Sequence, residues 1–312
     1  MPTPLTLVVA ADSRCVPGCA VTVRSVLSRL EGGCGAEVFL FVHGVSNPDQ
    51  RRLQATVNAL GGKHQVVIVP FNPKAVAGGL ARSRLISPMA YASCVLDRLL
   101  PDRVHRCIYM DCDIVATRDV GELWKTDLGG NTLAAVSDGN EGVLLEHQSR
   151  LGLKRPQYFN SGVLLVDLEL WREREVSERA LKVAARLGPR LILHDQDALN
   201  LALEGDWLSL DPVWNTWTIR PGLTRGDNVL FHFMGAPKPW HADYDRPFGD
   251  LFFAELDRTV FGGWRPWNPL GLGGALARLR RRIPWIPGAV RAIKARFSPP
   301  APKGGWQPEH ET

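Results

Sequence analysis

The segment Ile108-Tyr109-Met110-Asp111-Cys112-Asp113-Ile114-Val115 places two carboxylates, two positions apart, directly after a hydrophobic strand. Alternate residues of an extended segment point the same way, so Asp111 and Asp113 can reach one divalent cation. Oxygen ligands of this kind suit Mg²⁺ or Mn²⁺, and such a cation would stabilise a diphosphate as a leaving group. A solvated turn after a strand has the same pattern, so the pair alone leaves that interpretation open.

This segment follows a regular alternation of strands and helices. Apolar runs predict strands at Leu5–Ala11, Val38–Val42, Gln65–Val69 and Arg106–Met110. Helices are predicted between them at Pro17–Leu30, at Pro48–Leu60 with Asn47 as its cap, and at Pro88–Leu100. The alternation favours an α/β fold with a mainly parallel sheet that helices cover on both faces.

The position of the carboxylate pair also bears on a rival interpretation. Haloacid-dehalogenase-type phosphatases carry a similar pair after a hydrophobic strand, and its first carboxylate is the nucleophile. In those enzymes the pair usually lies on the first strand of the fold, whereas Asp111 follows about the fourth. The placement disfavours a phosphatase and leaves it as an alternative.

The second part of the chain continues the pattern and then changes in composition. Further strands are predicted at Thr132–Val136, Gly162–Val166, Trp207–Leu210 and Val229–Phe233, which would complete the sheet, and helices at Val176–Leu187 and Asp195–Leu203. No acidic residue occurs between Thr259 and Pro308. We therefore predict one domain over residues 1–262 and a separate basic tail over residues 263–312.

Composition limits the cellular setting. The chain has 312 residues, a formal net charge of +5, and six cysteines without the paired spacing of a zinc knuckle. We interpret the cysteines as reduced thiols in a reducing compartment. The N-terminus reads as a first strand and not as a signal peptide, and no run reaches the roughly 18 apolar residues of a membrane span. The sequence therefore predicts a cytoplasmic protein that could meet a membrane only at its surface.

Four further segments carry polar groups at strand or helix ends. Ala10-Ala11-Asp12 ends the first strand, where Asp12 and Asp111 would line one crevice beyond the carboxyl ends of the strands. Asn160-Ser161-Gly162 precedes a predicted strand, and its glycine would permit close approach of a ligand. Asp195 and Gln196 open a helix that Asp195 could cap. The string His232-Phe233-Met234-Gly235-Ala236-Pro237-Lys238-Pro239-Trp240 offers an imidazole for a metal, a glycine and a lysine for a phosphate. Taken singly, each of these has a bland interpretation as a turn, a cap or a core residue.

Taken together and in this order, the five segments resemble glycosyltransferase family 8 over about residues 5–245. That family includes bacterial lipopolysaccharide galactosyl- and glucosyltransferases and glycogenin. The resemblance implies a GT-A type, Rossmann-like nucleotide-binding fold, a UDP-sugar donor and transfer with retention of configuration. It also implies Mn²⁺ as the cofactor, with Mg²⁺ as the alternative.

The resemblance also assigns roles to individual residues. Asp111, Asp113 and His232 correspond to the metal ligands. Asp12, Gly235 and Lys238 correspond to contacts with UDP, with the backbone of Ala10 and Ala11 near the uracil. The donor sugar would meet Asn160, Asp195 and Gln196, of which Gln196 lies at the β-face of the anomeric carbon and is, with Asp195, the catalytic candidate. We also expect Cys112, Asp138 and Ser161 to contact the substrate.

Two departures from the family pattern concern the donor. Cys15 stands where the family often has an aromatic residue that packs on uracil, and Ser93 stands where a Tyr-x-Arg motif has its arginine. Arg82 or Arg84 could replace that arginine.

The expected activity is transfer of glucose or galactose from a UDP-sugar to a saccharide or lipid-linked acceptor, in cell-surface polysaccharide or lipopolysaccharide synthesis. Because Gln196 is not a strong nucleophile, a front-face reaction is favoured over a double displacement, with Asp138 and Asp195 as alternative nucleophiles. A catalytically inactive nucleotide-sugar-binding protein is the non-enzymatic alternative, and the retention of all the site residues argues against it.

The tail predicts contact with a membrane. Between Arg265 and Phe297 eight basic residues alternate with tryptophan, leucine and isoleucine, and Pro284 and Pro287 divide the run into short amphipathic pieces. This composition suits an interfacial helix on anionic lipid at the inner face of the membrane. A helix packed on the domain is the alternative interpretation, and no nucleic-acid-binding motif occurs. The Pro-rich end from Ser298 is predicted to be disordered.

Overall fold

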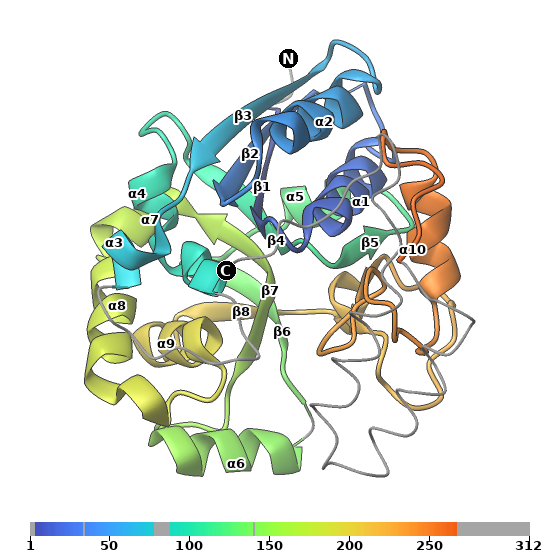
Figure 1. Cartoon of the computed structure of the whole chain (residues 1–312). Helices are drawn as coiled ribbons and strands as arrows, with labels where there is room; N and C mark the ends of the chain where they lie inside the picture. Colours follow the sequence, from blue (N-terminus) through green and yellow to red (C-terminus); the bar gives the residue numbers. More distant parts are fainter. Residues whose placement is uncertain (1–3, 34, 78–87, 140, 267–312) are drawn as a thin grey trace.

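A computed structural model describes residues 4–33, 35–77, 88–139 and 141–266 (Figure 1). The tail from residue 267 on, with its predicted amphipathic pieces and disordered end, lies outside the described residues. So do Arg82 and Arg84.

The centre of the fold is a seven-stranded sheet in the order β3-β2-β1-β4-β7-β6-β8 (Figure 1). Its strands are β1 Leu5–Asp12, β2 Ala36–His43, β3 His64–Pro70, β4 Arg106–Asp111, β6 Leu133–Ser137, β7 Phe159–Asp167 and β8 Trp207–Leu210. The pairs β1–β2, β2–β3, β1–β4 and β6–β8 are parallel, and β7 runs antiparallel to both β4 and β6. The predicted mainly parallel sheet is thus confirmed.

Helices cover both faces of this sheet, as the alternation of strands and helices predicts (Figure 1). The helical elements are α1 Val16–Leu27, α2 Asn47–Asn58, α3 Pro73–Ala77, the 3₁₀ helix η1 Pro88–Val95, α4 Leu96–Leu99, α5 Gly121–Lys125, α6 Glu141–Leu151, α7 Leu168–Glu173, α8 Val176–Leu187, the short η2 Gly188–Arg190, α9 His194–Ala202, η3 Pro212–Trp214 and α10 Gly249–Leu256. Successive residues of β1 show the two layers. Val9 packs in the core that contains α1, α2 and α10, and Val8 in the core that contains η1, α8 and α9.

A small second sheet stands beside the carboxylate pair. It consists of β5 Ile114–Ala116, β10 Leu230–His232 and β9 Thr216–Trp217, in the order β5-β10-β9. The prediction that Val229–Phe233 completes the main sheet is therefore wrong. The chain turns after Asp113 and starts β5 in a new direction, and helix α1 holds it there: Ser25 Oγ accepts a hydrogen bond from Ala116 N at 3.0 Å. The turn brings β10, and with it His232, next to Asp113.

Two local predictions of helix caps are wrong, and one predicted helix differs in its type. The cap of α2 is Ser46, whose Oγ accepts a hydrogen bond from Asp49 N, because Asn47 already lies in the helix. The predicted helix 88–100 is mostly 3₁₀, and within it the Ser93 hydroxyl donates to Ala90 O, three residues back, at 2.9 Å. Asp195 is not a cap, because α9 begins at His194 and the N-cap position is Leu193.

The last described residues still pack on the domain. Glu255 of α10 is buried between Arg24 of α1 and Arg29, which follows that helix, with N–O distances of 2.5 Å to each. Beyond α10, Trp264 packs against the core and Arg265 pairs with Asp257 at 2.7 Å. No helix among the described residues is long and apolar enough to cross a membrane.

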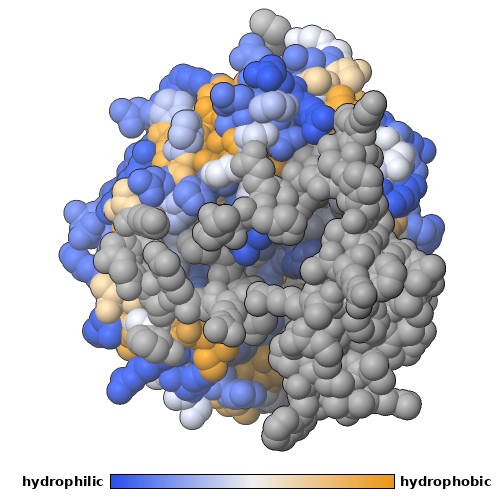
Figure 2. Space-filling view, viewed as in Figure 1, coloured by the Kyte–Doolittle hydropathy of each residue, from blue (hydrophilic) through white to orange (hydrophobic). Residues whose placement is uncertain are grey.

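The visible surface of the described residues is mainly polar. On the face shown in Figure 2 the described residues are mostly hydrophilic, and apolar side chains show at separate places.

Candidate active site

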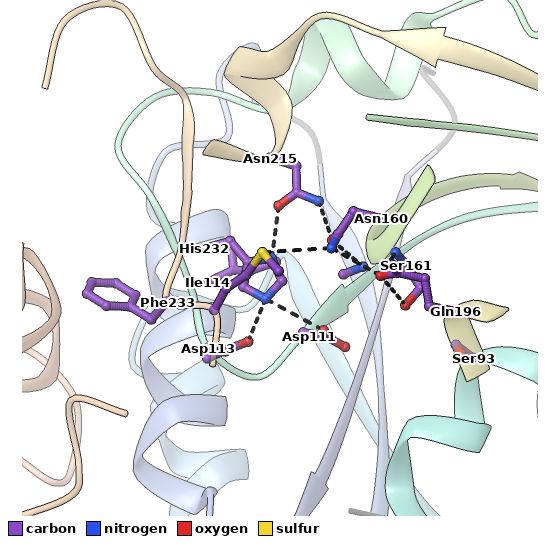
Figure 3. Close-up of polar contacts among 12 residues, drawn as sticks. Ser93, Asp111, Asp113, Ile114, Asn160, Ser161, Gln196, Asn215, His232 and Phe233 are labelled. Carbon is purple, nitrogen blue, oxygen red and sulfur yellow. Dashed lines mark hydrogen bonds and ion pairs between the residues drawn. The ribbon is translucent and has the colours of Figure 1, made fainter. Parts of the chain in front are cut away.

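Asp111, Asp113 and His232 meet in space, as predicted (Figure 3). Asp111 ends β4, Asp113 lies in the turn before β5, and His232 ends β10. His232 Nε2 lies 3.2 Å from Asp113 Oδ1 and 3.7 Å from Asp111 Oδ2, and one ligand atom from each residue lies within 4.8 Å of the others. Two carboxylates and one imidazole at these distances are a donor set for a hard or borderline divalent cation.

The imidazole of His232 is oriented by a residue that the sequence did not single out. Asn215 Oδ1 lies 2.9 Å from His232 Nδ1, and Asn215 Nδ2 donates to Asn160 Oδ1 at 2.8 Å. Since the oxygen of Asn215 faces the ring and can only accept, Nδ1 carries a proton, and Nε2 faces the carboxylates. No motif marks Asn215, which lies between Trp214 and Thr216 in an otherwise ordinary segment.

Gly162 makes room for the imidazole of His232. It lies inside β7, because Asn160-Ser161-Gly162 belongs to the strand and does not precede it. A Cβ atom at position 162 would lie 2.3 Å from His232 Cε1 and 2.8 Å from His232 Nδ1. The absence of a side chain therefore lets the ring lie flat against the strand.

The charged groups of the cluster shift one another's pKa values. Burial acts to raise the pKa of Asp113, but the positive charge of Lys238 and the contact with His232 outweigh it and hold that pKa well below its usual range. Burial raises the pKa of Asp111 to about 6, and repulsion from Asp113 adds to the effect. Lys238 Nζ donates to Asp113 Oδ2 and to Phe233 O, the latter at 2.9 Å. The predicted phosphate-binding lysine thus lies directly beside the carboxylate pair.

A second group of polar side chains adjoins the first. Gln196 Oε1 accepts from Ser161 N and Asn160 Nδ2, each at 3.1 Å (Figure 3). Gln196 Nε2 donates to Asp138 Oδ2 at 2.6 Å. A backbone N–H can only donate, so Ser161 N determines which end of the Gln196 amide is oxygen. Gln196 and Asn160, which sequence reasoning placed near the donor sugar, therefore form one hydrogen-bonded unit with Asp138 and Ser161, which it expected to contact the substrate.

Asp195 is held by two hydroxyl groups. Ser161 Oγ lies 3.0 Å and Ser93 Oγ 3.2 Å from Asp195 Oδ2. Burial raises the pKa of Asp195 to about 7, with a further contribution from the charge of Asp111. Ser93, at the position where the family pattern has arginine, thus contacts the same carboxylate from η1.

The remaining predicted residues lie along the carboxyl ends of the strands. Ala10 pairs with Asp111 in register, which places Asp12 at the same edge of the sheet as the carboxylate pair. Asp12 N donates to Cys15 Sγ at 3.3 Å, and Arg14 pairs with the Asp12 carboxylate at 2.6 Å. The neighbouring Cys15 thiol and burial both raise the pKa of the Cys112 thiol. Ala11 is buried, and Gly235 turns the chain between His232 and Lys238 with φ +68°.

Two known proteins illustrate which sequences this chain resembles. General stress protein A of Bacillus subtilis (strain 168) is 26% identical over 264 residues, which cover 79% of this chain and 89% of that protein. Lipopolysaccharide 1,2-glucosyltransferase of Escherichia coli (strain K12) is 31% identical over 160 residues, and the match covers 46% of each chain.

The fold also has a counterpart of known structure. A crystal structure of the galactosyltransferase LgtC, in complex with donor and acceptor sugar analogues, matches with a TM-score of 0.71 at 22% identity. The match covers 82% of this chain and 96% of that one, and it shows the GT-A fold. The sequence model of the family described as Glycosyl transferase family 8 matches residues 6–244. The chain, a glycosyltransferase by fold and by sequence, therefore belongs to glycosyl transferase family 8.

Proposed function

We propose that this chain transfers a hexose, glucose or galactose, from a UDP-sugar to a saccharide or lipid-linked acceptor with retention of configuration. The proposal includes a role in cell-surface polysaccharide or lipopolysaccharide synthesis. One observation carries it: the Asp111, Asp113 and His232 cluster adjoins the unit formed by Gln196 and its partners. A charged diphosphate and a neutral sugar would thus each meet suitable groups. The E. coli relative and LgtC, whose names state glucosyl and galactosyl transfer, support it.

The metal that suits this cluster is Mn²⁺, with Mg²⁺ as the alternative. The two carboxylates favour a hard divalent cation, and a neutral imidazole favours manganese over magnesium. The bond from Asn215 leaves His232 Nε2 free for coordination. When bound, the ion would neutralise charge on the diphosphate leaving group. Lys238 adds a fixed positive charge at the same place, because its ammonium group lies against Asp113.

Gln196 supports a front-face reaction. Its carbonyl oxygen already accepts hydrogen bonds from Ser161 N and Asn160 Nδ2, and its nitrogen is bound to Asp138, so neither atom is a free nucleophile. In the proposed step the bond between the anomeric carbon and the UDP oxygen breaks, and the acceptor oxygen bonds to that carbon on the same face. The acceptor's proton passes to the departing phosphate oxygen. Gln196 and Asp195 then serve to orient the sugar.

Replacement of Gln196 by alanine tests this role. We expect Gln196→Ala to keep a tenth or more of the turnover, because loss of an orienting amide costs less than loss of a covalent nucleophile. Turnover would be measured with saturating donor and Mn²⁺. Capture of a sugar adduct on Asp195 or Asp138 would contradict the front-face reaction.

The function itself is tested with a panel of nucleotide sugars. The full-length protein would be incubated with Mn²⁺ and UDP-glucose, UDP-galactose and other nucleotide sugars, and release of UDP would be scored. Hydrolysis of a UDP-hexose is expected, whereas tight UDP binding without hydrolysis would favour the inactive binding protein. The position of the carboxylate pair on β4 and the family match leave the phosphatase alternative without support.

The metal site is tested at His232 and at its partner. His232→Ala is expected to raise the Mn²⁺ concentration needed for half-maximal activity. Asn215→Ala should raise it by roughly 10–100-fold, the usual cost of losing the partner that orients a metal-binding histidine. Metal affinity would be measured by titration of UDP-sugar hydrolysis. An unchanged Mn²⁺ dependence in His232→Ala would remove His232 from the ligand set.

We further propose that the protein works in the cytoplasm at the inner face of the membrane, held there by its basic tail. Eight basic residues near an anionic surface, at about 1 kcal/mol each, could hold it reversibly. Because Trp264 and Arg265 pack on the domain, the truncation that tests this is best made after Pro266, which removes the other seven of these basic residues. The shortened protein is expected to lose its binding to anionic vesicles and to keep its rate of UDP-sugar hydrolysis. Equal vesicle binding by both proteins at physiological salt would refute the idea.

A further inference from the structure

The first turn of helix α9 carries Asp195 and Gln196, yet the backbone at the start of this helix has an unfavourable conformation. Its N-cap, Leu193, makes no side-chain capping bond, and His194 has φ +42°. A positive φ is costly for a residue with a side chain and persists only where the surroundings impose it. Some other contact must therefore hold the start of this helix.

Asp197 is that contact. Its carboxylate is fully buried, and Oδ2 accepts hydrogen bonds from Ile192 N at 2.8 Å and Leu193 N at 3.0 Å. Oδ1 accepts the hydroxyl of Tyr158 at 2.6 Å. The Asp197 side chain thus fastens both the segment before α9 and the residue before β7 to the first turn of the helix.

A buried carboxylate of this kind needs a cation, and Arg150 supplies it. The guanidinium group binds both carboxylate oxygens, Nη1 to Oδ2 at 2.9 Å and Nη2 to Oδ1 at 2.7 Å. This two-point geometry fixes direction as well as charge. Burial acts to raise the pKa of Asp197, but the bonds from Arg150 and Tyr158 outweigh it and lower that pKa. Because the Asp197 carboxylate is not in contact with solvent, Arg150 stabilises its negative charge in place of water.

Arg150 belongs to α6, which is attached to α9 at both of its ends. In Figure 1 the helix lies at the lower end of the molecule, beneath α9. None of its eleven residues is buried, so apolar packing contributes little to its position. Shortly before its start, Asp138 accepts the Gln196 amide, and near its end Arg150 binds Asp197. The ring of His147, on the same helix, stacks on the ring of Tyr158, and the two ring centroids lie 3.9 Å apart.

We propose that Arg150 is a positioning residue for the transfer reaction: acting through Asp197, it holds the first turn of α9 so that Asp195 and Gln196 face the donor sugar. This inference rests on the proposed function. None of the three residues of the metal cluster lies on α9 or α6, because Asp111, Asp113 and His232 come from β4, the following turn and β10. Loss of Arg150 therefore impairs the chemical step and leaves nucleotide binding in place.

The test compares Arg150→Ala with Arg174→Ala in the full-length protein. Arg174 is the control, since this partly buried arginine also pairs with a carboxylate, Asp206, at 2.5 Å without contact to the first turn of α9. We expect Arg150→Ala to lower kcat for UDP-hexose hydrolysis by roughly 10²-fold, the usual effect of a displacement near 1 Å. Its affinity for UDP with Mn²⁺ should stay within about twofold of the unaltered protein. Added guanidinium ion should restore part of the rate in Arg150→Ala, and Arg150→Lys should not restore it fully, because an ammonium group cannot bind both oxygens.

A second readout needs no activity. Hydrogen exchange of the Ile192 and Leu193 amides should become faster in Arg150→Ala and stay unchanged in Arg174→Ala. Unchanged exchange and unchanged kcat in Arg150→Ala would overturn the proposal. Equal losses of kcat and of UDP affinity in both variants would also overturn it, since that result indicates a general loss of stability. If no nucleotide sugar is hydrolysed even by the unaltered protein, the proposed function fails, and the exchange measurement still decides whether Arg150 holds α9.

Discussion

Replacing Asp113 with asparagine is expected to lower UDP-hexose hydrolysis by roughly 10²–10³-fold, the range seen when one preorganised electrostatic group is removed from an active site. Asp113 contacts His232 and Lys238 at the same time, so the substitution removes an anionic metal ligand and releases the lysine from its place. Asp111→Asn should act in the same direction. The rate and the Mn²⁺ dependence would be measured together.

The fold should survive this change, because asparagine keeps the size of the side chain, although loss of the ion pair with Lys238 lowers the stability. Thermal unfolding would check this point. Asp227→Asn is the matched control, since Asp227 is 91% exposed and pairs with Arg118 at the surface. Full activity of Asp113→Asn without added metal would show that the metal site is misassigned.

Replacing Gly162 with alanine is expected to reduce activity about as much as His232→Ala does, although a methyl group is a small change. The new Cβ would lie 2.3 Å from His232 Cε1, far inside contact distance. The ring is buried and bound to Asn215, so it cannot move aside without leaving the carboxylates. Overpacking of this kind also costs about 1–3 kcal/mol of stability.

Hydrolysis at increasing Mn²⁺, together with urea unfolding, would measure both effects. Gly62→Ala is the control, because no atom lies within 4 Å of the position where its Cβ would be. A normal Mn²⁺ requirement in Gly162→Ala would mean that the imidazole does not depend on its contact with β7.

Local patterns in the sequence were sufficient for most of the central sheet. The runs at Leu5–Ala11 and Trp207–Leu210 and the helix Val176–Leu187 appear where their periodicity predicts them. Alternation and helical period are properties of neighbouring residues, and burial on both faces reinforces them. The same holds for the carboxylate pair, whose spacing already implies one shared direction. Asp111, Asp113 and His232 could therefore be named as a group from the sequence and the resemblance.

Predictions failed where a distant segment decided the outcome. Nothing near Val229–Phe233 shows that this strand pairs with β5 instead of completing the main sheet, because the turn at Asp113 and the hydroxyl groups of α1 decide it. Asn160-Ser161-Gly162 looks like a turn in isolation, yet its bonds to Gln196 and Asn215 keep it in β7. Turn-forming residues take extended structure when tertiary partners satisfy their polar groups.

The sequence by itself determined the order of strands and helices, the carboxylate pair and the family, because these depend on residue types at fixed spacings along the chain. Only the tertiary structure decided that Asn215 orients His232, that Gly162 makes room for its ring, and that Arg150 secures Asp197. Each of these contacts joins residues that are far apart in sequence, and its strength depends on distance, direction and burial. None of those three quantities is a property of the chain before it folds.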